Sequence, residues 1–276
     1  MSDVREWSRS DAARFFRAPT AEDDKYSRGV VGIRTGSAAY PGAAVLGVEA
    51  AWRTGAGFVR YVGAPSAVAA VLARRPETVG GPDAGRTRIG AWVIGSGTDP
   101  DDRSTAEAQA LREIVDGDVP VVIDAGALDL APTARAPFVA TPHGREFARL
   151  RERVGIDGAG DDLADVRDVS AAIDGVVLRK GARTLLAAPD GTLIAVEAGT
   201  GWLATAGTGD VLAGIVAAVI AANPDGPLVE SAAAAVWLHG YAARLAAAAT
   251  AGASGHPIVA LDVAEALPRA VADLLS

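Results

Sequence analysis

The residues best suited to chemistry lie in one stretch in the last third of the chain. Gly207, Thr208 and Gly209 form a small-residue turn, and Asp210 stands where an apolar run begins. The apolar residues recur at helical spacing, which predicts a helix with one apolar face: Val211, Leu212, Ile215, Val216, Val219 and Ile220. A glycine turn that opens such a helix leaves backbone N–H groups unpaired beside a partial positive charge. The stretch therefore predicts a site for a phosphate or another developing anion.

Asp210 has two interpretations on these residues alone. A carboxylate at the start of a helix can cap it, because side-chain oxygens accept hydrogen bonds from the first N–H groups. The same carboxylate beside a bound phosphate can accept a proton during phosphoryl transfer. The rest of the chain has to decide between a capped buried helix and a proton acceptor.

A second candidate is the turn Lys180-Gly181-Ala182-Arg183-Thr184, which lies between two predicted strands. Lys180 offers an ammonium group, Gly181 allows a close approach to the backbone, and Thr184 offers a hydroxyl. This combination suits the phosphates of a nucleotide, although many surface turns share the composition.

Three further candidates follow predicted strands. Gly95 and Gly97 flank Ser96 just past a short apolar strand, where open α/β sheets place ligands. His143 lies in a strand-to-helix loop, either as a ligand contact or as an exposed turn residue. Asp124 ends another strand, where it either caps the next turn or orients a substrate group or a hydrated Mg²⁺.

Small residues begin the helix predicted over Pro41 to Arg53, namely Gly42, Ala43 and Ala44. They either let a ligand approach the backbone or let the helix pack tightly on the sheet. The chain has three scattered histidines and no cysteine, so no dedicated metal-ligand set is readable.

Strands alternate with helices from Gly29 to Ala188, after a polar entry segment with a short helix. The predicted strands span residues 29–35, 58–62, 91–94, 121–124, 138–141, 176–179, 185–188 and 193–196. The predicted helices span residues 41–53, 65–75, 102–115, 163–173, 228–250 and 262–275, with one opened by 142–146 and one by Asp210. Several strands are continuous apolar runs. The pattern predicts one domain over residues 1–276, with a mostly parallel sheet covered on both faces.

Composition excludes several classes of function. A formal charge of −8 and a pI near 4.9 argue against nucleic-acid binding. The absence of cysteine removes disulfides, thiolate catalysis and cysteine-ligated metals. The N-terminal residues lack the apolar run of a signal peptide, and the late apolar stretch 231–253 contains His239 and Arg244, which are costly in a bilayer. We therefore expect a cytoplasmic protein without a membrane segment.

The Gly-Thr-Gly-Asp stretch resembles the anion-hole signature of the ribokinase-like superfamily. Six other stretches resemble one branch of it, the ADP/ATP-dependent NAD(P)H-hydrate dehydratases, and they occur in that family's order along nearly the whole chain. They are Gly29 to Gly32, Pro41-Gly42-Ala43-Ala44, Gly95-Ser96-Gly97, Val122 to Leu128, Thr141-Pro142-His143 with Glu146, and Lys180 to Thr184. The P-loop, dinucleotide-binding and nucleophile-elbow motifs are absent from the sequence.

The resemblance implies a three-layer α/β/α ribokinase-like fold with a mostly parallel central sheet, and repair of hydrated NADH or NADPH at the expense of ADP or ATP. It implies that Asp210 is the general base and that the N–H groups of Gly207, Thr208 and Gly209 stabilise the transferring phosphoryl group. The nucleotide would bind at residues 180–184 and Gly209.

The resemblance further implies that Ala44, Gly97 and His143 line the side of the hydrated cofactor, together with Asp210. Mg²⁺ is expected with the nucleotide, because phosphoryl transfer needs its charge neutralised. A homo-tetramer is also implied, and the Ala-rich C-terminal helices are candidates for its interface.

Two alternatives remain open. A ribokinase-like kinase for a vitamin precursor or a sugar would share the turn and the fold but would leave a stable phosphorylated product. A degenerate nucleotide-binding protein would bind ADP without turning over a hydroxylated substrate.

Overall fold

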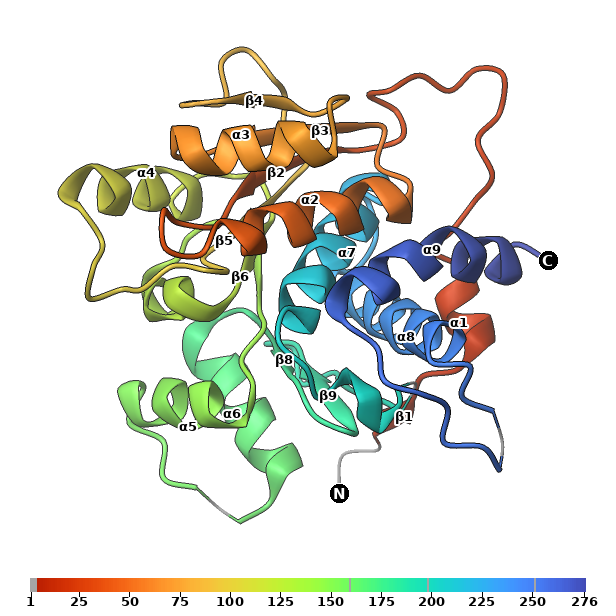
Figure 1. Ribbon diagram of the computed structural model, residues 1–276. Coiled ribbons are helices and arrows are strands. Elements are labelled where there is room, and N and C mark those ends of the chain that lie inside the picture. The colour runs from red at the N-terminus through yellow and green to blue at the C-terminus, as the bar shows by residue number, and fades with distance from the viewer. Residues whose placement is uncertain (1–3, 159, 198, 251) are drawn as a thin grey trace.

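A ten-stranded sheet runs through the centre of the computed structural model, which describes residues 4–158, 160–197, 199–250 and 252–276 (Figure 1). The strand order is β1-β10-β9-β8-β7-β6-β5-β2-β3-β4. The strands are β1 (Arg5–Glu6), β2 (Val30–Arg34), β3 (Phe58–Val62), β4 (Val79–Gly81), β5 (Ala91–Ile94), β6 (Val121–Ile123), β7 (Phe138–Ala140), β8 (Val176–Arg179), β9 (Thr184–Ala187) and β10 (Leu193–Val196).

Nine α-helices and two 3₁₀ helices are found in the described part of the chain. They are α1 (Arg9–Ala13), α2 (Pro41–Thr54), α3 (Pro65–Arg74), α4 (Thr105–Val115), η1 (Ala125–Thr133), α5 (Gly144–Arg153), α6 (Asp162–Ile173), η2 (Gly201–Leu203), α7 (Thr208–Ala222), α8 (Leu228–Ala246) and α9 (Ala260–Leu274).

The sheet is parallel except at β9, which pairs antiparallel with both β8 and β10. Strands β2, β5, β6 and β7 have almost no exposed residues, as expected for parallel strands covered on both faces. The predicted mostly parallel sheet is therefore confirmed.

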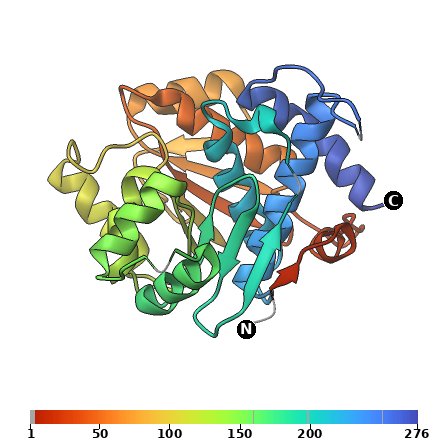
Figure 2. The same cartoon turned by 90° about the horizontal axis from the view of Figure 1, so that it is seen from below.

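Two layers of helices cover the sheet (Figure 2). On one face, α2, α7, α8 and α9 bury the side chains of alternate strand residues such as Val31 and Val93. On the other face, α4, α5, α6 and η1 bury the strand residues that alternate with these, such as Trp92 and Ile94. This alternation follows from the two-residue period of a strand, and it completes the predicted three-layer α/β/α architecture.

Helix α7 differs from its prediction. The sequence indicated one apolar face, whereas every residue from Val211 to Ala221 is buried. Helices α2, α8 and α9 all pack against it, in addition to the sheet (Figure 1). Its small and aliphatic residues allow this because they present no polar group on any side.

Short elements account for most of the other differences. Strand β1 lies in the predicted polar entry segment, and β4 lies between the helix predicted over residues 65–75 and the strand predicted over 91–94. Helix η1 follows β6 where the sequence indicated only a turn. Helix α8 ends at Ala246, four residues before its predicted end. Among the described residues, none of the helices has the length and apolar character that crossing a bilayer would need.

Candidate active site

Four polar residues meet where parallel strands β5, β6, β7 and β8 end. Ser96, Asp124, Thr141 and Lys180 each follow one of these strands within two residues, so the sheet brings them to one edge. Asp124 accepts hydrogen bonds from Ser96 Oγ at 2.7 Å, Thr141 Oγ1 at 2.7 Å and Lys180 Nζ at 2.8 Å. We call these four residues the Asp124 cluster.

Asp124 does not cap the turn that follows it, so the first of its two sequence interpretations is wrong. Its side chain makes no capping hydrogen bond to η1, and its carboxylate is 2% exposed. Burial raises the pKa of this carboxyl, but Lys180 and the hydroxyls of Thr141 and Ser96 more than offset that effect and leave the pKa below its usual value. Asp124 is therefore a buried anion matched to a cation.

The first turn of α7 lies at the same edge of the sheet. Gly207 precedes the helix with φ +88°, a left-handed conformation that favours glycine. The N–H of Val211 is bonded to the Gly207 carbonyl at 3.1 Å, so the N–H groups of Thr208 and Gly209 come before the first helical hydrogen bond. The predicted anion-binding helix start is therefore present in the fold.

Asp210 does not cap this helix. It is half-buried, and its carboxylate makes no hydrogen bond to any residue that the structure describes. Burial and, to a smaller extent, the charge of Asp124 together raise the pKa of Asp210 to about 6, against the opposing effect of Lys180. A carboxylate with this pKa is partly protonated just below neutral pH and is suited to accept a proton.

Lys180 connects the Asp124 cluster to the helix. Its ammonium nitrogen lies 3.3 Å from the point where a Cβ on Gly209 would stand. Burial lowers the pKa of Lys180, but Asp124 outweighs burial and leaves it above its usual value, so the ammonium stays charged. The ammonium therefore lies at the first turn of α7, near Asp210 and the N–H groups that precede the first helical hydrogen bond. A cation beside such donors suits a phosphoryl group.

The rest of the predicted nucleotide turn points elsewhere. Arg183 is ion-paired with Glu6 and with Glu197, the latter at 3.4 Å. Thr184 is buried, and its Oγ1 donates to the Gly181 carbonyl at 3.1 Å. Gly181 and Ala182 are exposed at the tip. The structure therefore brings Lys180 to Gly209 and leaves the Arg183 guanidinium at the edge of the sheet.

The residues predicted for the hydrated cofactor also lie at this edge, but their contacts differ. Gly97 packs so closely on α2 that a Cβ there would lie 2.5 Å from Ala43 Cβ, and one on Gly36 would lie 2.9 Å from Ala44 Cβ. Ala44 is fully buried. The small residues at the start of α2 thus provide tight packing, the second of their two interpretations.

His143 is exposed and caps α5. Its Nδ1 accepts hydrogen bonds from the N–H groups of Arg145 and Glu146, at 3.1 and 3.3 Å. Its backbone lies beside Lys180, since the Lys180 N–H donates to the Pro142 carbonyl at 2.8 Å. The capping role fixes the ring next to the site with its Nε2 toward Glu146, 3.5 Å away.

Two buried polar groups near the site were not identified from the sequence. Thr35 follows β2, and its Oγ1 has no hydrogen-bond partner among the described residues; the same is true of His239 Nε2 on α8. The ring of His239 faces the backbone of Thr208, and burial lowers its pKa to about 4. In the sequence His239 is a polar residue that follows an apolar run, whereas Thr35, between Arg34 and Gly36, has no such signal.

No group of three or more histidine, aspartate or glutamate side chains that could hold a metal ion is found within the described residues. All three close contacts of Asp124 are to protein donors. We therefore assign no protein ligand to a metal ion. Magnesium typically binds proteins through few carboxylates and through substrate phosphates, so it would enter with a nucleotide.

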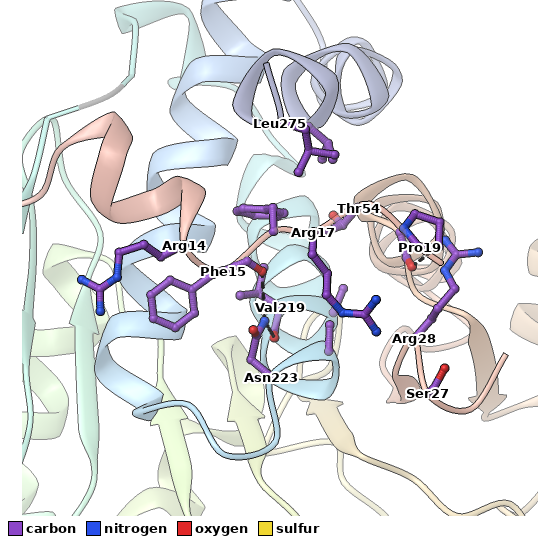
Figure 3. A pocket seen from close by; sticks show the side chains of 15 residues that line it. Arg14, Phe15, Arg17, Pro19, Ser27, Arg28, Thr54, Val219, Asn223 and Leu275 are labelled. Atoms are coloured by element: carbon purple, nitrogen blue, oxygen red, sulfur yellow. Dashed lines mark hydrogen bonds between the residues drawn. The ribbon is translucent and has the colours of Figure 1, made fainter. Parts of the chain in front are cut away.

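A separate cavity of about 200 Å³ lies at the other end of α7 (Figure 3). Its wall combines apolar side chains such as Phe15 and Val219 with three arginines, all of which have protein partners. Arg14 is paired with Asp11 and Glu230, Arg17 is paired with Asp23, and Arg28 donates to the Gly55 carbonyl. No aspartate or glutamate is among the described residues that line this cavity, whereas Asp210 stands at the start of the helix.

Comparison with known proteins gives a consistent result. A family model described as NAD(P)H-hydrate dehydratase matches residues 31–267. The bifunctional NAD(P)H-hydrate repair enzyme Nnr of Mycobacterium tuberculosis is 41% identical over 230 residues, which cover 80% of this chain and 47% of the relative. The chain thus spans about half the length of the first such relatives.

Two further comparisons cover most of both chains. The ADP-dependent (S)-NAD(P)H-hydrate dehydratase of Neisseria meningitidis is 36% identical over 83% of this chain and 80% of its own. The crystal structure of the ADP/ATP-dependent NAD(P)H-hydrate dehydratase of Bacillus subtilis, co-crystallized with ATP and Mg²⁺, superposes with a TM-score of 0.85 and 26% identity, covering 99% of this chain and 100% of that chain.

Proposed function

The chain belongs to the NAD(P)H-hydrate dehydratase family, and on that premise we propose that it dehydrates (S)-NADHX or NADPHX to the reduced cofactor, with ADP or ATP as phosphoryl donor. It is then a carbon–oxygen lyase of metabolite repair, acting as one domain over residues 1–276. The observation that carries the proposal is the half-buried Asp210 carboxylate, which has no hydrogen-bond partner among the described residues and stands in the first turn of α7 near the Lys180 ammonium.

The residues supply each part of the first step. Asp210 accepts the proton of the ring hydroxyl, and the hydroxyl oxygen forms a bond to the terminal phosphorus of the nucleotide. The bond between that phosphorus and the nucleotide's bridging oxygen breaks. The N–H groups of Gly207, Thr208 and Gly209 face the transferring group, and losing one such donor typically costs about 10²–10³ in rate. Phosphate then leaves its ring carbon, the neighbouring ring carbon loses a proton to solvent, and the double bond that forms between them restores the reduced nicotinamide.

The remaining predicted residues divide between the two substrates. The nucleotide contacts residues 180–184 and Gly209, with Lys180 as the principal cation and Arg183 as an outer one. The hydrated cofactor contacts His143 and Gly97, whereas Ala44, which is fully buried, shapes this side of the site through its packing on Gly36. Mg²⁺ bound to the nucleotide phosphates neutralises their charge.

A homo-tetramer is our proposal from the family resemblance. The small residues of α8 are mostly buried within the chain itself. The interface of a tetramer would therefore be formed by other parts of the surface.

The first experiment is a turnover assay on the purified chain with hydrated NADH, Mg²⁺, and ADP or ATP separately, followed by the return of the reduced nicotinamide absorbance. A kinase of the same fold would instead accumulate a phosphorylated product and release no phosphate. A degenerate binding protein would bind ADP without any change in absorbance.

Substitution Asp210→Asn tests the base. It should lower kcat by about 10²–10⁴, the usual contribution of a general base, while Mg·ADP still binds in calorimetry. Asp225→Asn, an exposed carboxylate beyond the other end of α7, is the matched control and should keep wild-type turnover. Near-normal turnover of the Asp210 variant would remove this residue from the base role.

A further inference from the structure

The polar side chains of the Asp124 cluster are hydrogen-bonded to one another. Both carboxylate oxygens of Asp124 are occupied by protein donors: Oδ1 by Lys180 and Thr141, and Oδ2 by Ser96. Ser96, Asp124 and Thr141 are each 1–2% exposed. Such a carboxylate has little access to a substrate, so its effect has to reach the reaction through a neighbour.

Lys180 is that neighbour, because its long side chain is flexible and the hydrogen bond to Asp124 fixes the position of its ammonium group. The backbone of Lys180 is fixed by its bond to Pro142, but four rotatable bonds separate it from the ammonium. Fixing such a side chain costs up to about 2 kcal/mol of rotamer entropy. Asp124 holds the ammonium before a ligand arrives, at the point 3.3 Å from the Cβ position of Gly209.

We propose that Asp124 is a positioning residue, which Ser96 and Thr141 orient, and that it fixes the Lys180 ammonium against the first turn of α7 where the terminal phosphoryl group is received. This inference rests on the proposed function and extends it to three residues without an assigned role. Three adjacent strand ends thereby fix one charge, so the cation and the helix N–H groups form a single prepared anion site.

The same arrangement connects Asp124 to the base. Burial, then Asp124, raises the pKa of Asp210, and Lys180 lowers it. The other titratable groups facing Lys180 are Glu146 on α5 and His239 on α8. His239 is neutral near pH 7, because burial lowers its pKa to about 4. Removing the charge of Asp124 should therefore lower the pKa of Asp210.

The test measures kcat and kcat/KM for hydrated NADH between pH 5 and 8, at saturating Mg·ADP. It compares the wild type with Asp124→Asn and Thr141→Val. We expect Asp124→Asn to lower kcat by about 10²-fold or more, as misplacement of a reacting group by 1 Å can do. Its acid limb should move to lower pH. Thr141→Val keeps the charge, so it should lower kcat less and leave the acid limb where it is.

Asp190→Asn, an exposed carboxylate in the β9–β10 turn, is the matched control and should change neither quantity. An unchanged acid limb in folded Asp124→Asn, or a wild-type kcat, would overturn the proposal. Should Asp124→Asn not fold, the double variant S96A/T141V takes its place, and a wild-type kcat there would overturn it equally.

Calorimetric binding of Mg·ADP separates this inference from the proposed function. If the wild type binds Mg·ADP but does not turn over hydrated NADH, the proposed function fails. The inference still predicts about tenfold weaker binding to Asp124→Asn than to Asp190→Asn. Equal affinities would show that Asp124 does not position Lys180.

Discussion

At the scale of single residues, the site contains a carboxylate that the fold does not stabilise. Asp210 is half-buried, has no hydrogen-bond donor among the described residues and lies near the negative charge of Asp124. Its pKa rises from 3.8 in the unfolded reference to about 6 in the fold. The ionised form therefore destabilises the folded state. This penalty is fully present above pH 6 and is lost as the pH falls below about 4.

Asp210→Asn should for this reason make the protein more stable at pH 8, by about 2 kcal/mol, a value that allows for partial solvent exposure at 1.36 kcal/mol per pKa unit. The gain should shrink toward zero at pH 3, where the wild-type carboxyl is mostly protonated in both states. Urea unfolding at the two pH values measures it, with Asp225→Asn as the reference. Equal stability of Asp210→Asn and the wild type at pH 8 would contradict the cost assigned to this carboxylate.

The sequence identified Asp210 but not the partners of Asp124, and the difference is physical. The Gly-Thr-Gly-Asp turn and its helix are adjacent in sequence, so their geometry is local. Asp124 contacts Ser96, Thr141 and Lys180, which lie 28, 17 and 56 residues away. Those contacts depend on which strands are neighbours and in what register, and a carboxylate at a strand end looks the same whether it caps a turn or binds a lysine.

At the scale of elements, one glycine, Gly214, sets the distance between α2 and α7. A Cβ on Gly214 would lie 2.4 Å from the Gly47 carbonyl oxygen and 3.0 Å from Ala50 Cβ, so the two helix backbones are nearly in contact there. A Cβ on Gly47 would have only the Asp210 carbonyl oxygen nearby, at 3.7 Å. The close approach thus depends on Gly214, within the turn after Asp210.

Gly214→Ala should destabilise the protein by about 1–3 kcal/mol, because the helices must separate to admit a methyl group. Gly47→Ala makes the same chemical change inside a helix without the overlap, so it should be neutral or stabilising by up to about 1 kcal/mol. Thermal unfolding of both variants checks the difference. Gly214→Ala should also lower kcat, since Asp210 moves with α7. Similar melting temperatures for the two variants would show that α2 and α7 can move apart without a loss of stability.

Element prediction succeeded where the pattern was long and failed where it was short. Strands β3, β5, β8 and β10 begin and end where the sequence placed them, because apolar runs bounded by glycine, proline and charged residues are clear local signals. Strands β1 and β4 have two and three residues, too few to show a period. For α7, periodicity revealed the helix but not that all its sides are covered, which depends on where three other helices pack.

At the scale of the whole molecule, the candidate site draws its residues from distant parts of the chain. The Asp124 cluster joins the ends of four strands, and α7 follows in sequence only after β10. A mostly parallel sheet could be predicted from the apolar strands, whereas the order of its strands could not, because nothing local in a strand specifies its neighbours. A ligand that contacts this edge holds together segments that separate on unfolding.

Binding of Mg·ADP should therefore raise the melting temperature of the entire fold. At a free concentration 100-fold above Kd, linkage predicts about 2.7 kcal/mol of stabilisation, which for a chain of this size corresponds to about 5–10 °C. Lys180→Met should lose most of that shift, since it removes the cation at the start of α7. Arg183→Ala should lose less, because that guanidinium is half-exposed and paired with Glu6. A differential scanning fluorimetry titration gives all three values, and a full shift in Lys180→Met would place the nucleotide phosphates away from Gly209.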